Sequence, residues 1–450
     1  MRKVNGSGVH REFTSAQTFE RVRPYLRSAG VTRISDVTWL DRVGIPVYNA
    51  IAPRSNDIIS VYNGKGLTPQ DARTSAVMEA IERFSAGLPM RPAAVASYEE
   101  LLKAGRKVFN PRDSNVLLSR HYRDDAPLSW VEAYDLMNEE SVLVPQDCVV
   151  YSLHSHEPPS YEVSTTNGLA SGNCLEEAVC HALTELIERD SMTNAELVSN
   201  QLCQILEKGL LVDPQPAQLT RWLKEMHPHL DLDSLPQLAQ QLVQKFRDAG
   251  LHIRIVHITS DLGIPSFLAA VAEEFGPTMS KGHGGFGTHP DAEVALIRAI
   301  TECAQSRAVD IQAMREDIRL PNELVSKYQK HVQRSSTIDQ GAWAWRPQHR
   351  VVKFSDIPTW KSGDVMDDVR LIIDRLLEAG IPRVMVVDLS PPGIPVKVVR
   401  VMVPQLESWA VDHSRIGGRG ARAWNQAVAQ LSQMKRQVDD RDGQRQEAGA

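Results

Sequence analysis

Hydrophobic and polar positions alternate along this chain with two different periods, and the two periods predict both helices and strands. Apolar residues that recur with the helical period predict helices over residues 16–29, 69–86, 97–104, 175–194, 291–310 and 364–379. Shorter runs of apolar or alternating residues predict strands over residues 44–48, 58–62, 128–133, 141–145, 252–259, 266–272, 384–388 and 396–403. We therefore expect a mixed α/β (α+β) fold.

Three of the predicted helices belong to a repeated pattern in which a glycine-rich turn precedes the helix. The repeats cover residues 64–83, 168–189 and 284–307, and they align on Glu82, Glu188 and Gln305. Every repeat has a glutamate three positions earlier and an alanine ten positions earlier: Glu79, Glu185 and Glu302, then Ala72, Ala178 and Ala295. Strand, glycine turn and helix thus recur three times, which indicates three related units packed around a shared site.

The spacing of the acidic side chains in the repeats suggests metal binding. Residues three apart lie on the same face of a helix, so each repeat offers a pair of oxygen ligands in register. Several carboxylates in one place repel each other unless cations lie between them. One copy of the motif alone would be typical of a charged helix surface. Three copies beside apolar helix positions favour a site for hard metal ions and for a metal-bound polyphosphate.

Composition argues against several other classes of protein. The 450 residues are 42% hydrophobic and 24% charged, as in ordinary globular proteins, and the net charge of -6 gives no electrostatic support for nucleic acid binding. No apolar run is long enough to cross a membrane, and no apolar segment follows the basic N-terminal residues as a secretory signal would require. The five cysteines form no C-x-x-C pair, which predicts reduced thiols in a cytoplasmic protein.

A metal hydrolase is a further alternative, and the histidines argue against it. The repeats contain neither an H-x-x-H nor an H-E-x-x-H arrangement that would hold a water-activating metal. We interpret His181, His283 and His289 as structural or surface residues.

The motifs in the repeats resemble those of YcaO-domain proteins. The first is Ser75-x-x-x-Glu79-x-x-Glu82-Arg83 after Gly64-Lys65-Gly66. The second runs from Asn167-Gly168 through Glu176-Glu177-Ala178 to Glu185-x-x-Glu188-Arg189-Asp190, and the third is Arg298-Ala299-x-x-Glu302-x-x-Gln305-x-Arg307. The resemblance covers the chain from its start to about residue 410. It implies a YcaO-type fold of repeated strand–turn–helix units around a shared nucleotide site.

The resemblance and the sequence pattern together suggest a domain organisation. Residues 1–60 would be an N-terminal segment that contributes to the fold, and residues 61–410 the YcaO domain. Residues 205–250 are polar and helical in pattern, with proline breaks, and could be an accessory insertion. Residues 411–450 would form a C-terminal helix and a charged tail. From about residue 435 this tail lacks apolar periodicity, so we expect it to be disordered.

A reaction class follows from the same resemblance. YcaO proteins bind ATP and Mg²⁺, and they phosphorylate the oxygen of a backbone amide after a nucleophile has added to the amide carbon. A neighbouring Cys, Ser or Thr side chain as nucleophile gives an azoline, whereas external sulfide gives a thioamide. Phosphoryl transfer needs mainly positioning and charge neutralisation, which carboxylate-held metal ions supply.

Site residues are carried over from the family motifs, position by position. The expected magnesium ligands are Glu79, Glu82, Glu185 and Glu188. Further contacts with the nucleotide or its metal are expected from Ser75, Asn173, Glu177, Arg298, Gln305 and Arg307, and from Lys3 and Arg11 of the N-terminal segment. For Arg83, Arg189 and Arg307, an ion pair with a helix acid is an equally good interpretation. No catalytic residue is assigned.

Residues 32–47 and 60–66 resemble the thioamide-forming branch of the family, whose members work with a TfuA partner that is thought to deliver sulfur. The Pro-x-Pro-x-Pro tail of the azoline-forming branch is not found, and the proline cluster at 391–395 is interpreted as a turn. The resemblance therefore implies thioamide formation in a peptide or protein substrate, with a sulfide source. An azoline-forming cyclodehydratase of a ribosomal natural-product pathway and a non-catalytic nucleotide-binding accessory protein stay open. The substrate is not selected by the sequence, and a homodimer is left open.

Overall fold

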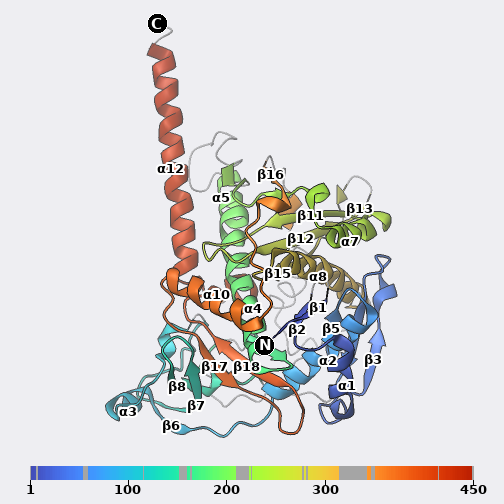
Figure 1. Cartoon of the computed structure of the whole chain (residues 1–450). Helices are drawn as coiled ribbons and strands as arrows, with labels where there is room; N and C mark the ends of the chain where they lie inside the picture. Colours follow the sequence, from blue (N-terminus) through green and yellow to red (C-terminus); the bar gives the residue numbers. More distant parts are fainter. Residues whose placement is uncertain are drawn as a thin grey trace, which may run out of the picture.

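Figure 1 shows the computed structural model, which describes residues 2–6, 9–53, 59–114, 116–151, 160–162, 165–208, 222–223, 225–275, 278–279, 282–313, 342–345, 350–413 and 415–447. Helices and strands are mixed throughout these ranges, so the predicted α/β class is confirmed. Within them, the larger sheets have three, five and six strands, and two further sheets have two strands each.

The described strands are β1 (Val4–Gly6), β2 (Val9–Arg11), β3 (Arg33–Asp36), β4 (Val47–Ile51), β5 (Val61–Lys65), β6 (Ala94–Ser97), β7 (Pro127–Asp135), β8 (Glu140–Pro145), β9 (Leu169–Gly172), β10 (His229–Leu230), β11 (His252–His257), β12 (Ser266–Ala272), β13 (Glu274–Phe275), β14 (Thr278–Met279), β15 (His283–Thr288), β16 (Val351–Val352), β17 (Met385–Asp388) and β18 (Lys397–Met402). The described α-helices are α1 (Ser15–Val22), α2 (Pro69–Ala86), α3 (Tyr98–Lys103), α4 (Leu175–Ala195), α5 (Cys203–Glu207), α7 (Gln237–Asp248), α8 (Ala292–Ala313), α10 (Val365–Glu378), α11 (Trp409–Asp412) and α12 (Gly418–Glu447).

Each sequence repeat forms a strand, a tight turn and a helix that packs back on that strand. The three pairs are β5 with α2, β9 with α4, and β15 with α8. Every one of the three strands is the edge strand of a different sheet, in the orders β3-β4-β5, β6-β7-β17-β18-β9 and β15-β12-β11-β10-β16. Each of the three larger sheets therefore has one repeat helix packed on its edge strand, and the inner faces of these three helices meet.

Glycine on the strand and alanine on the helix bring each pair close together. A Cβ atom added at Gly64 would lie 2.1 Å from the backbone oxygen of Ala72, and one at Gly287 would lie 2.0 Å from that of Ala295. No side chain fits at such distances, so the strand must be glycine there. Ala72 and Ala295 are fully buried. The alanines shared by the repeats thus have a packing role, and this close packing fixes how each helix leaves its strand.

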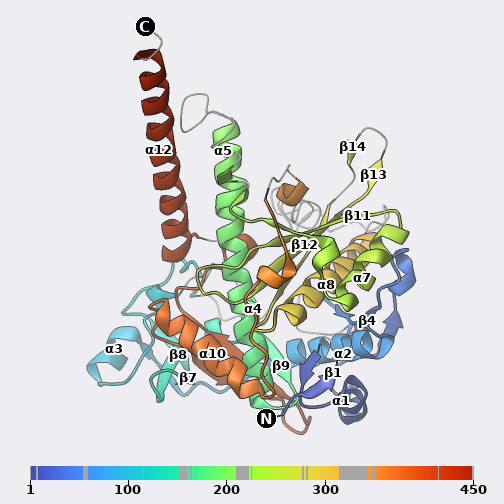
Figure 2. The same cartoon turned by 45° about the horizontal axis from the view of Figure 1, so that its top comes forward.

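Two of the larger sheets carry their helices on well-packed apolar faces. Helices α4 and α10 pack together and contribute to one core cluster with β18, while α7 and α8 form another with β11 and β12. The six-stranded sheet is antiparallel in all its pairs, and Leu169 of β9 lies opposite Arg400 of β18. Helix α4 runs through the middle of the molecule in both views (Figure 1, Figure 2).

Local signals explain where the structure shifts the predicted boundaries. The strand predicted at 44–48 is found at 47–51, as β4. It begins later than predicted because Pro46 lacks an N–H donor and Gly44 has a positive φ of 69°. The next strand moves in step, from 58–62 to 61–65. Helix α1 ends at Val22, well before residue 29, because Pro24 begins a tighter turn there. Ser97 caps α3 as predicted, through a capping box with Glu100.

The segment predicted as a helical insertion contains α7 in its described part. The buried side chains Ala239, Leu242, Val243 and Phe246 of α7 join the core cluster that contains α8. Residues 209–221 of the segment lie outside the described residues.

The C-terminal helix differs from the disordered tail that the sequence predicts. Helix α12 continues through the charged segment to Glu447 and projects away from the rest of the molecule (Figure 1, Figure 2). Ala427 and Leu431 of this helix pack against Val198 and Leu202. Gln, Arg and Glu have good intrinsic helix propensity, which supports a helix even without an apolar stripe. Among the described residues, no helix is long and apolar enough to cross a membrane.

Candidate functional site

The inner faces of α2, α4 and α8 surround a cavity of about 570 Å³, which the N-terminal segment also lines. A cavity of this size is in the range of small-molecule sites. Most residues that the sequence analysis assigned to binding line it: Arg11, Ser75, Glu79, Glu82, Asn173, Glu177, Glu185, Glu188, Arg298 and Gln305. The three repeats thus converge on one site, as their alignment predicts.

Four carboxyl groups from α2 and α4 line this cavity together, and their protonation is perturbed. Burial raises the pKa of Glu79 and Glu185, and it raises that of Glu82 to about 8 and that of Glu188 to about 7. Neighbouring acids act in the same direction, since each negative charge disfavours the next. Without a cation, burial therefore favours the protonated form of these groups. A divalent cation among them would favour their charged forms.

Two arginines face the four acids but lie too far away to bind them firmly. The Nη2 atom of Arg83 lies 3.7 Å from Glu79 Oε1, and its Nε atom lies 4.0 Å from Glu82 Oε1. Arg189 Nη1 lies 3.9 Å from Glu188 Oε1. These distances are ion-pair distances, beyond ordinary hydrogen bonds. The expected ion pairs are therefore present, although long, and both arginines also line the cavity.

The chemistry of this donor set fits magnesium. Mg²⁺ takes oxygen ligands and is usually held by one or two carboxylates together with phosphate oxygens. Two helices offer such oxygens, through the side chains of Glu79, Glu82, Glu185 and Glu188. None of these four ligands is a cysteine or a histidine. These four side chains would hold the ion or ions, with a phosphate chain completing the coordination.

A fifth acid completes the cluster together with a lysine, and neither belongs to the predicted binding set. Burial would raise the pKa of Glu302, but the ion pair with Lys65, the charge of Arg189 and the N–H of Phe286 outweigh it, so this pKa is lowered. Both Lys65 and Glu302 line the cavity. The sequence does contain a signal for Glu302, because this residue aligns with Glu79 and Glu185 in the repeats.

Glu177 anchors the N-terminal segment at the site. Its carboxylate accepts hydrogen bonds from Arg11 Nη1 at 2.9 Å, from the N–H of Glu12 at 3.1 Å and from Asn173 Nδ2 at 3.2 Å. Asn173 Oδ1 in turn accepts from Thr18 Oγ1 at 3.0 Å. With its oxygens engaged in this way, Glu177 orients Arg11 and Asn173 at the cavity.

Helix α8 contributes a cation and an amide from the predicted set. Arg298 donates to the backbone oxygen of Thr288 at 3.2 Å and to Thr184 Oγ1 at 3.4 Å. Burial lowers the pKa of Arg298 to about 10, so its guanidinium still carries a charge at neutral pH. Gln305 Nε2 donates to the backbone oxygen of Asn63 at 3.1 Å, which ties α8 to β5. Arg298 is therefore a fixed cation suited to phosphate.

Two predicted residues are not brought to the cavity. Arg307 binds Asp41 with two hydrogen bonds, at 2.8 and 3.0 Å, and its buried side chain does not line the cavity. Lys3 is buried as well, with its Nζ atom 2.6 Å from Asp368 Oδ2 and 3.0 Å from Ser362 Oγ. In both cases an acid from a distant part of the sequence engages the cation, so Arg307 forms an ion pair, but with Asp41 and not with an acid of its own helix.

The histidines of the site were underestimated by the sequence analysis. His181, interpreted there as structural or surface, lines the cavity, and so does His10, which no motif singled out. Burial and neighbouring arginines lower the pKa of His181 well below its usual value, so its imidazole is neutral. His283 has the structural role expected, since its Nε2 lies 3.1 Å from Asp310 Oδ2. All five cysteines are free thiols, as predicted.

Comparison with known families gives one match that covers most of the chain. Residues 63–407 match the family described as YcaO cyclodehydratase, ATP- and Mg²⁺-binding. An uncharacterised protein of Methanothermobacter thermautotrophicus is 33% identical over 421 residues, which cover 90% of this chain and 97% of that protein. A protein of Rhizobium leguminosarum bv. trifolii, named for its position in the tfuA 3' region, is 32% identical over 402 residues, with 88% of each chain covered.

Solved structures show the same fold. YcaO from Methanopyrus kandleri, bound with AMPPCP and Mg²⁺, superposes with a TM-score of 0.67 at 24% identity, over 93% of this chain and 98% of that one. A heterocyclase in complex with substrate and cofactor gives a TM-score of 0.69 at 22% identity, over 90% of this chain and 54% of that one. At these identities the likeness establishes the architecture.

Proposed function

The chain belongs to the YcaO family of ATP- and Mg²⁺-binding cyclodehydratases, and we propose that it uses ATP to convert a backbone amide of a peptide or protein into a thioamide. In the proposed reaction, the protein works with a TfuA-like partner and uses a source of sulfide. The use of ATP in this proposal rests on the set of four carboxyl groups with raised pKa values around one cavity, beside the fixed cation Arg298. That arrangement suits a polyphosphate neutralised by magnesium.

The need for ATP follows from the chemistry of the amide. An amide oxygen is a poor leaving group, and transfer of a phosphoryl group to it makes it a good one. In the proposed reaction, hydrosulfide adds to the amide carbon and the resulting oxyanion takes the γ-phosphoryl group. The C–O bond then breaks, phosphate leaves and the thioamide remains. Magnesium, when bound, neutralises the phosphate charge that develops during this transfer.

We assign the following tasks to residues of this chain. The metal ions are held by Glu79, Glu82, Glu185 and Glu188. Lys65 pairs with Glu302 in the same cavity and keeps it negatively charged. Arg298 and Arg11 hold phosphate oxygens in the same cavity, with Arg11 oriented by Glu177. Ser75, Asn173 and Gln305 offer uncharged polar groups for the nucleotide.

Support for the sulfur-installing branch comes from two observations. The relative from Rhizobium leguminosarum bv. trifolii takes its name from a tfuA region and shares 32% identity over 88% of this chain. Residues 32–47 and 60–66 also resemble that branch, and in the structure they contain β3, the first residue of β4 and all of β5, beside α2. These segments lie in the sheet whose edge strand carries Lys65.

An azoline-forming cyclodehydratase is the second candidate, favoured by the description of the family and by the heterocyclase among the similar structures. The two functions share the activation step and differ in the nucleophile. The carboxyl cluster would serve both equally well, because it acts on phosphate and not on the incoming sulfur.

The test is intact-mass analysis of candidate peptides and proteins after incubation with ATP, Mg²⁺ and a TfuA-like partner, with and without sulfide. A sulfide-dependent gain equal to the replacement of one oxygen by sulfur, localised by fragmentation to a backbone amide, is the expected result. Loss of one water without any need for sulfide would select the azoline reaction. ATP binding without any peptide change would leave a nucleotide-binding accessory protein.

A further inference from the structure

We propose that a second cavity, where α12 leaves the body of the molecule (Figure 1), binds an acidic segment of the peptide or protein substrate. Its volume is about 440 Å³, and it shares no described lining residue with the cavity between α2, α4 and α8, which we call the ATP cavity. The inference rests on the proposed function for the nature of the substrate. The lining residues on α12 lie beyond the range 63–407 that matches the family, so the family motifs give them no role.

Arginines dominate the lining of the second cavity. Three segments that are distant in the sequence bring five of them together: Arg112, Arg383, Arg415, Arg419 and Arg422. Among the described lining residues, Asp113 is the only acid. The whole chain has a net charge of -6, so this cavity is a local concentration of positive charge on an acidic protein. Such a concentration attracts anionic groups and repels cationic ones.

Two of these arginines have no acid to bind. Among the described residues, neither Arg415 nor Arg422 forms an ion pair or a hydrogen bond to a carboxylate. The guanidinium of Arg422 lies over the start of its own helix, because a Cβ atom added at Gly418 would be 3.6 Å from Arg422 Nη1. Both charges therefore stay available to an anion that enters the cavity.

A third arginine is held only loosely by its acids. Arg383 Nη1 lies 3.7 Å from Asp135 Oδ2, and its Nη2 lies 3.7 Å from Glu140 Oε1. These distances exceed those of hydrogen bonds, so the N–H groups of Arg383 can still donate to a ligand. Arg112 differs, since its Nη2 donates to Asp124 Oδ2 at 2.9 Å. The cavity thus offers three guanidinium groups that lack close acceptors.

The start of α12 favours carboxylates over phosphate as the anions. A helix N-terminus commonly binds phosphate through its free backbone N–H groups. Here the buried carboxylate of Glu407 accepts the N–H of Gly417 at 2.8 Å and that of Gly420 at 2.7 Å. Recognition is left to the planar guanidinium groups, which pair with carboxylates through two parallel hydrogen bonds. Glutamate or aspartate side chains of a peptide fit this chemistry.

Arg419 connects the second cavity to the ATP cavity. Its Nε and Nη2 atoms each donate to Asp190 of α4 at 2.8 Å. Asp190 directly follows Glu188 and Arg189, which line the ATP cavity. A peptide bound in the second cavity therefore lies beside the helix that carries two of the proposed magnesium ligands. Because the substrate must reach the ATP cavity, this position favours the substrate as the source of the acidic segment.

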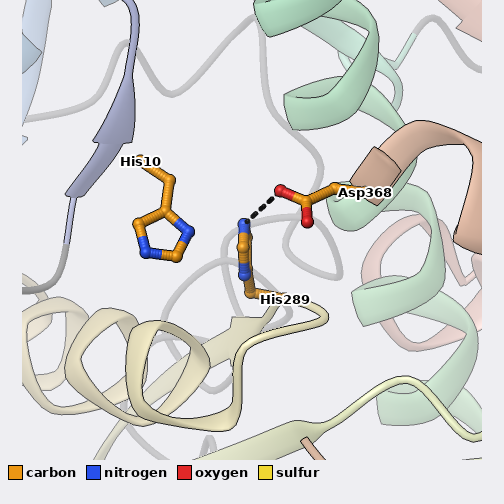
Figure 3. A group of neighbouring side chains, drawn as sticks. All are labelled: His10, His289 and Asp368. Carbon is orange, nitrogen blue, oxygen red and sulfur yellow. Dashed lines mark ion pairs between the residues drawn. The ribbon is translucent and has the colours of Figure 1, made fainter. Parts of the chain in front are cut away.

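Another polar cluster outside the second cavity offers no comparable site. Potential ligand atoms of His10, His289 and Asp368 lie within 4.8 Å of one another, as in a metal site (Figure 3). However, Lys3 Nζ lies 2.6 Å from Asp368 Oδ2 and already supplies the cation there. The N–H of Asp291 donates to His289 Nδ1 at 2.9 Å, so the proton of the neutral ring is on Nε2, which has no lone pair for a metal. We interpret this cluster as structural.

The experiment measures binding of a fluorescein-labelled hexaglutamate peptide to the full chain by fluorescence anisotropy. A non-hydrolysable ATP analogue with Mg²⁺ fills the ATP cavity throughout, and hexaglutamine is the uncharged control peptide. The site variant is Arg415→Gln/Arg422→Gln. The matched control is Arg370→Gln/Arg436→Gln, at exposed positions outside the cavity.

We expect the site variant to bind hexaglutamate about 10-fold or more weakly than wild type, because charge-assisted hydrogen bonds are lost. The control variant should bind as the wild type does. Removal of Arg415 and Arg422 leaves no described acid unpaired, so both variants should unfold at the wild-type temperature. With a substrate that the wild type converts, the site variant should raise the KM for that substrate and leave kcat and the KM for ATP unchanged.

Three results would overturn the inference. The first is equal affinity for hexaglutamate in wild type and site variant, and the second is equally tight binding of hexaglutamine. The third is an unchanged KM for the substrate with a lost affinity for the TfuA-like partner, which would assign the cavity to that partner. Stronger competition by inorganic phosphate than by unlabelled hexaglutamate would likewise replace the peptide by a phosphate ligand. If the wild type formed no thioamide, the proposed function would fall, whereas the hexaglutamate measurement would still decide whether the cavity binds acidic peptides.

Discussion

Lys65 and Glu302 form an ion pair although they lie 237 positions apart in the sequence. Lys65 ends the strand of the first repeat, and Glu302 lies on the helix of the third. The pair joins two of the three units at the cavity and keeps one of five neighbouring acids charged. It shows that the repeats cooperate in a single site and do not form three separate ones.

Replacing Lys65 by methionine should weaken the binding of Mg²⁺ and ATP. The variant removes a cation that balances the acid cluster, and a charge-assisted contact contributes about 2 kcal/mol, which corresponds to roughly 10- to 30-fold in affinity. Titration calorimetry with a non-hydrolysable ATP analogue measures the change. Lys103→Met is the matched control, because Lys103 is exposed and pairs with Glu99 of its own helix. Equal affinity in both variants would contradict the role of Lys65.

Glu82→Gln and Glu188→Gln should abolish magnesium-dependent ATP hydrolysis while leaving the fold intact. Glutamine removes the charge that a metal ligand needs but keeps the shape of the protonated acid. Unfolding temperatures should therefore stay at or above that of the wild type. Glu378→Gln, at an exposed helix position, controls for the substitution itself. Wild-type hydrolysis rates in either site variant would remove the proposed metal site.

The unliganded protein should lose stability as the pH rises from about 6.5 to about 8. Glu82 and Glu188 have folded-state pKa values of about 8 and about 7, above the usual 4.5, so the folded state binds more protons and stability falls as they ionise. Below pH 6.5, the buried histidines His227 and His257, with pKa values lowered to about 4, act in the opposite direction. Unfolding temperatures across this range should fall in wild type and less in Glu82→Gln. A flat profile in the wild type would exclude the raised pKa values.

Arg307→Met should destabilise the protein without changing its affinity for ATP. Arg307 and Asp41 are both buried, and removal of one partner of a buried ion pair costs about 3–5 kcal/mol because the other charge stays unpaired. Adding Asp41→Asn to the Arg307 variant should recover part of the loss. Denaturant unfolding and calorimetry measure the two quantities. A drop in ATP affinity with unchanged stability would instead place Arg307 at the nucleotide.

Truncation after Arg436 should leave ATP turnover unchanged. The described contacts of α12 with the rest of the molecule involve residues before this point, such as Ala427, Leu431 and Met434. Steady-state hydrolysis by the truncated protein checks the prediction. If truncation abolished turnover, the C-terminal segment would have a role at the active site.

Local sequence signals predicted the helices of the site well. Helix α2 has the predicted bounds because Thr68 caps it and Pro69 starts it, and both signals lie within a few residues. Helix α4 begins at Leu175 as predicted, but the chain stays helical past the predicted end at 194, through a π-helical segment (Glu196–Leu202) into α5. The glutamates of each repeat lie beside the apolar residues of the same helix. For this reason it could also be predicted that these glutamates meet at one cavity.

Long-range partners could not be predicted in the same way. The pairing of Arg307 with Asp41 depends on a turn 266 positions away, and that of Lys3 with Asp368 on α10. Nothing in the local pattern distinguishes an arginine that meets such an acid from one that faces a cavity. His10 was missed for the same reason, because its partner Asp291 comes from another unit.

The most direct test of the account follows the amide oxygen itself. A substrate labelled with heavy oxygen at the modified backbone carbonyl is incubated with the protein, ATP, Mg²⁺ and sulfide, and the released phosphate is analysed by mass spectrometry. Activation by phosphorylation predicts that each modified amide delivers its heavy oxygen to one phosphate. Phosphate without the label, alongside a modified peptide, would contradict transfer of the phosphoryl group to the amide oxygen.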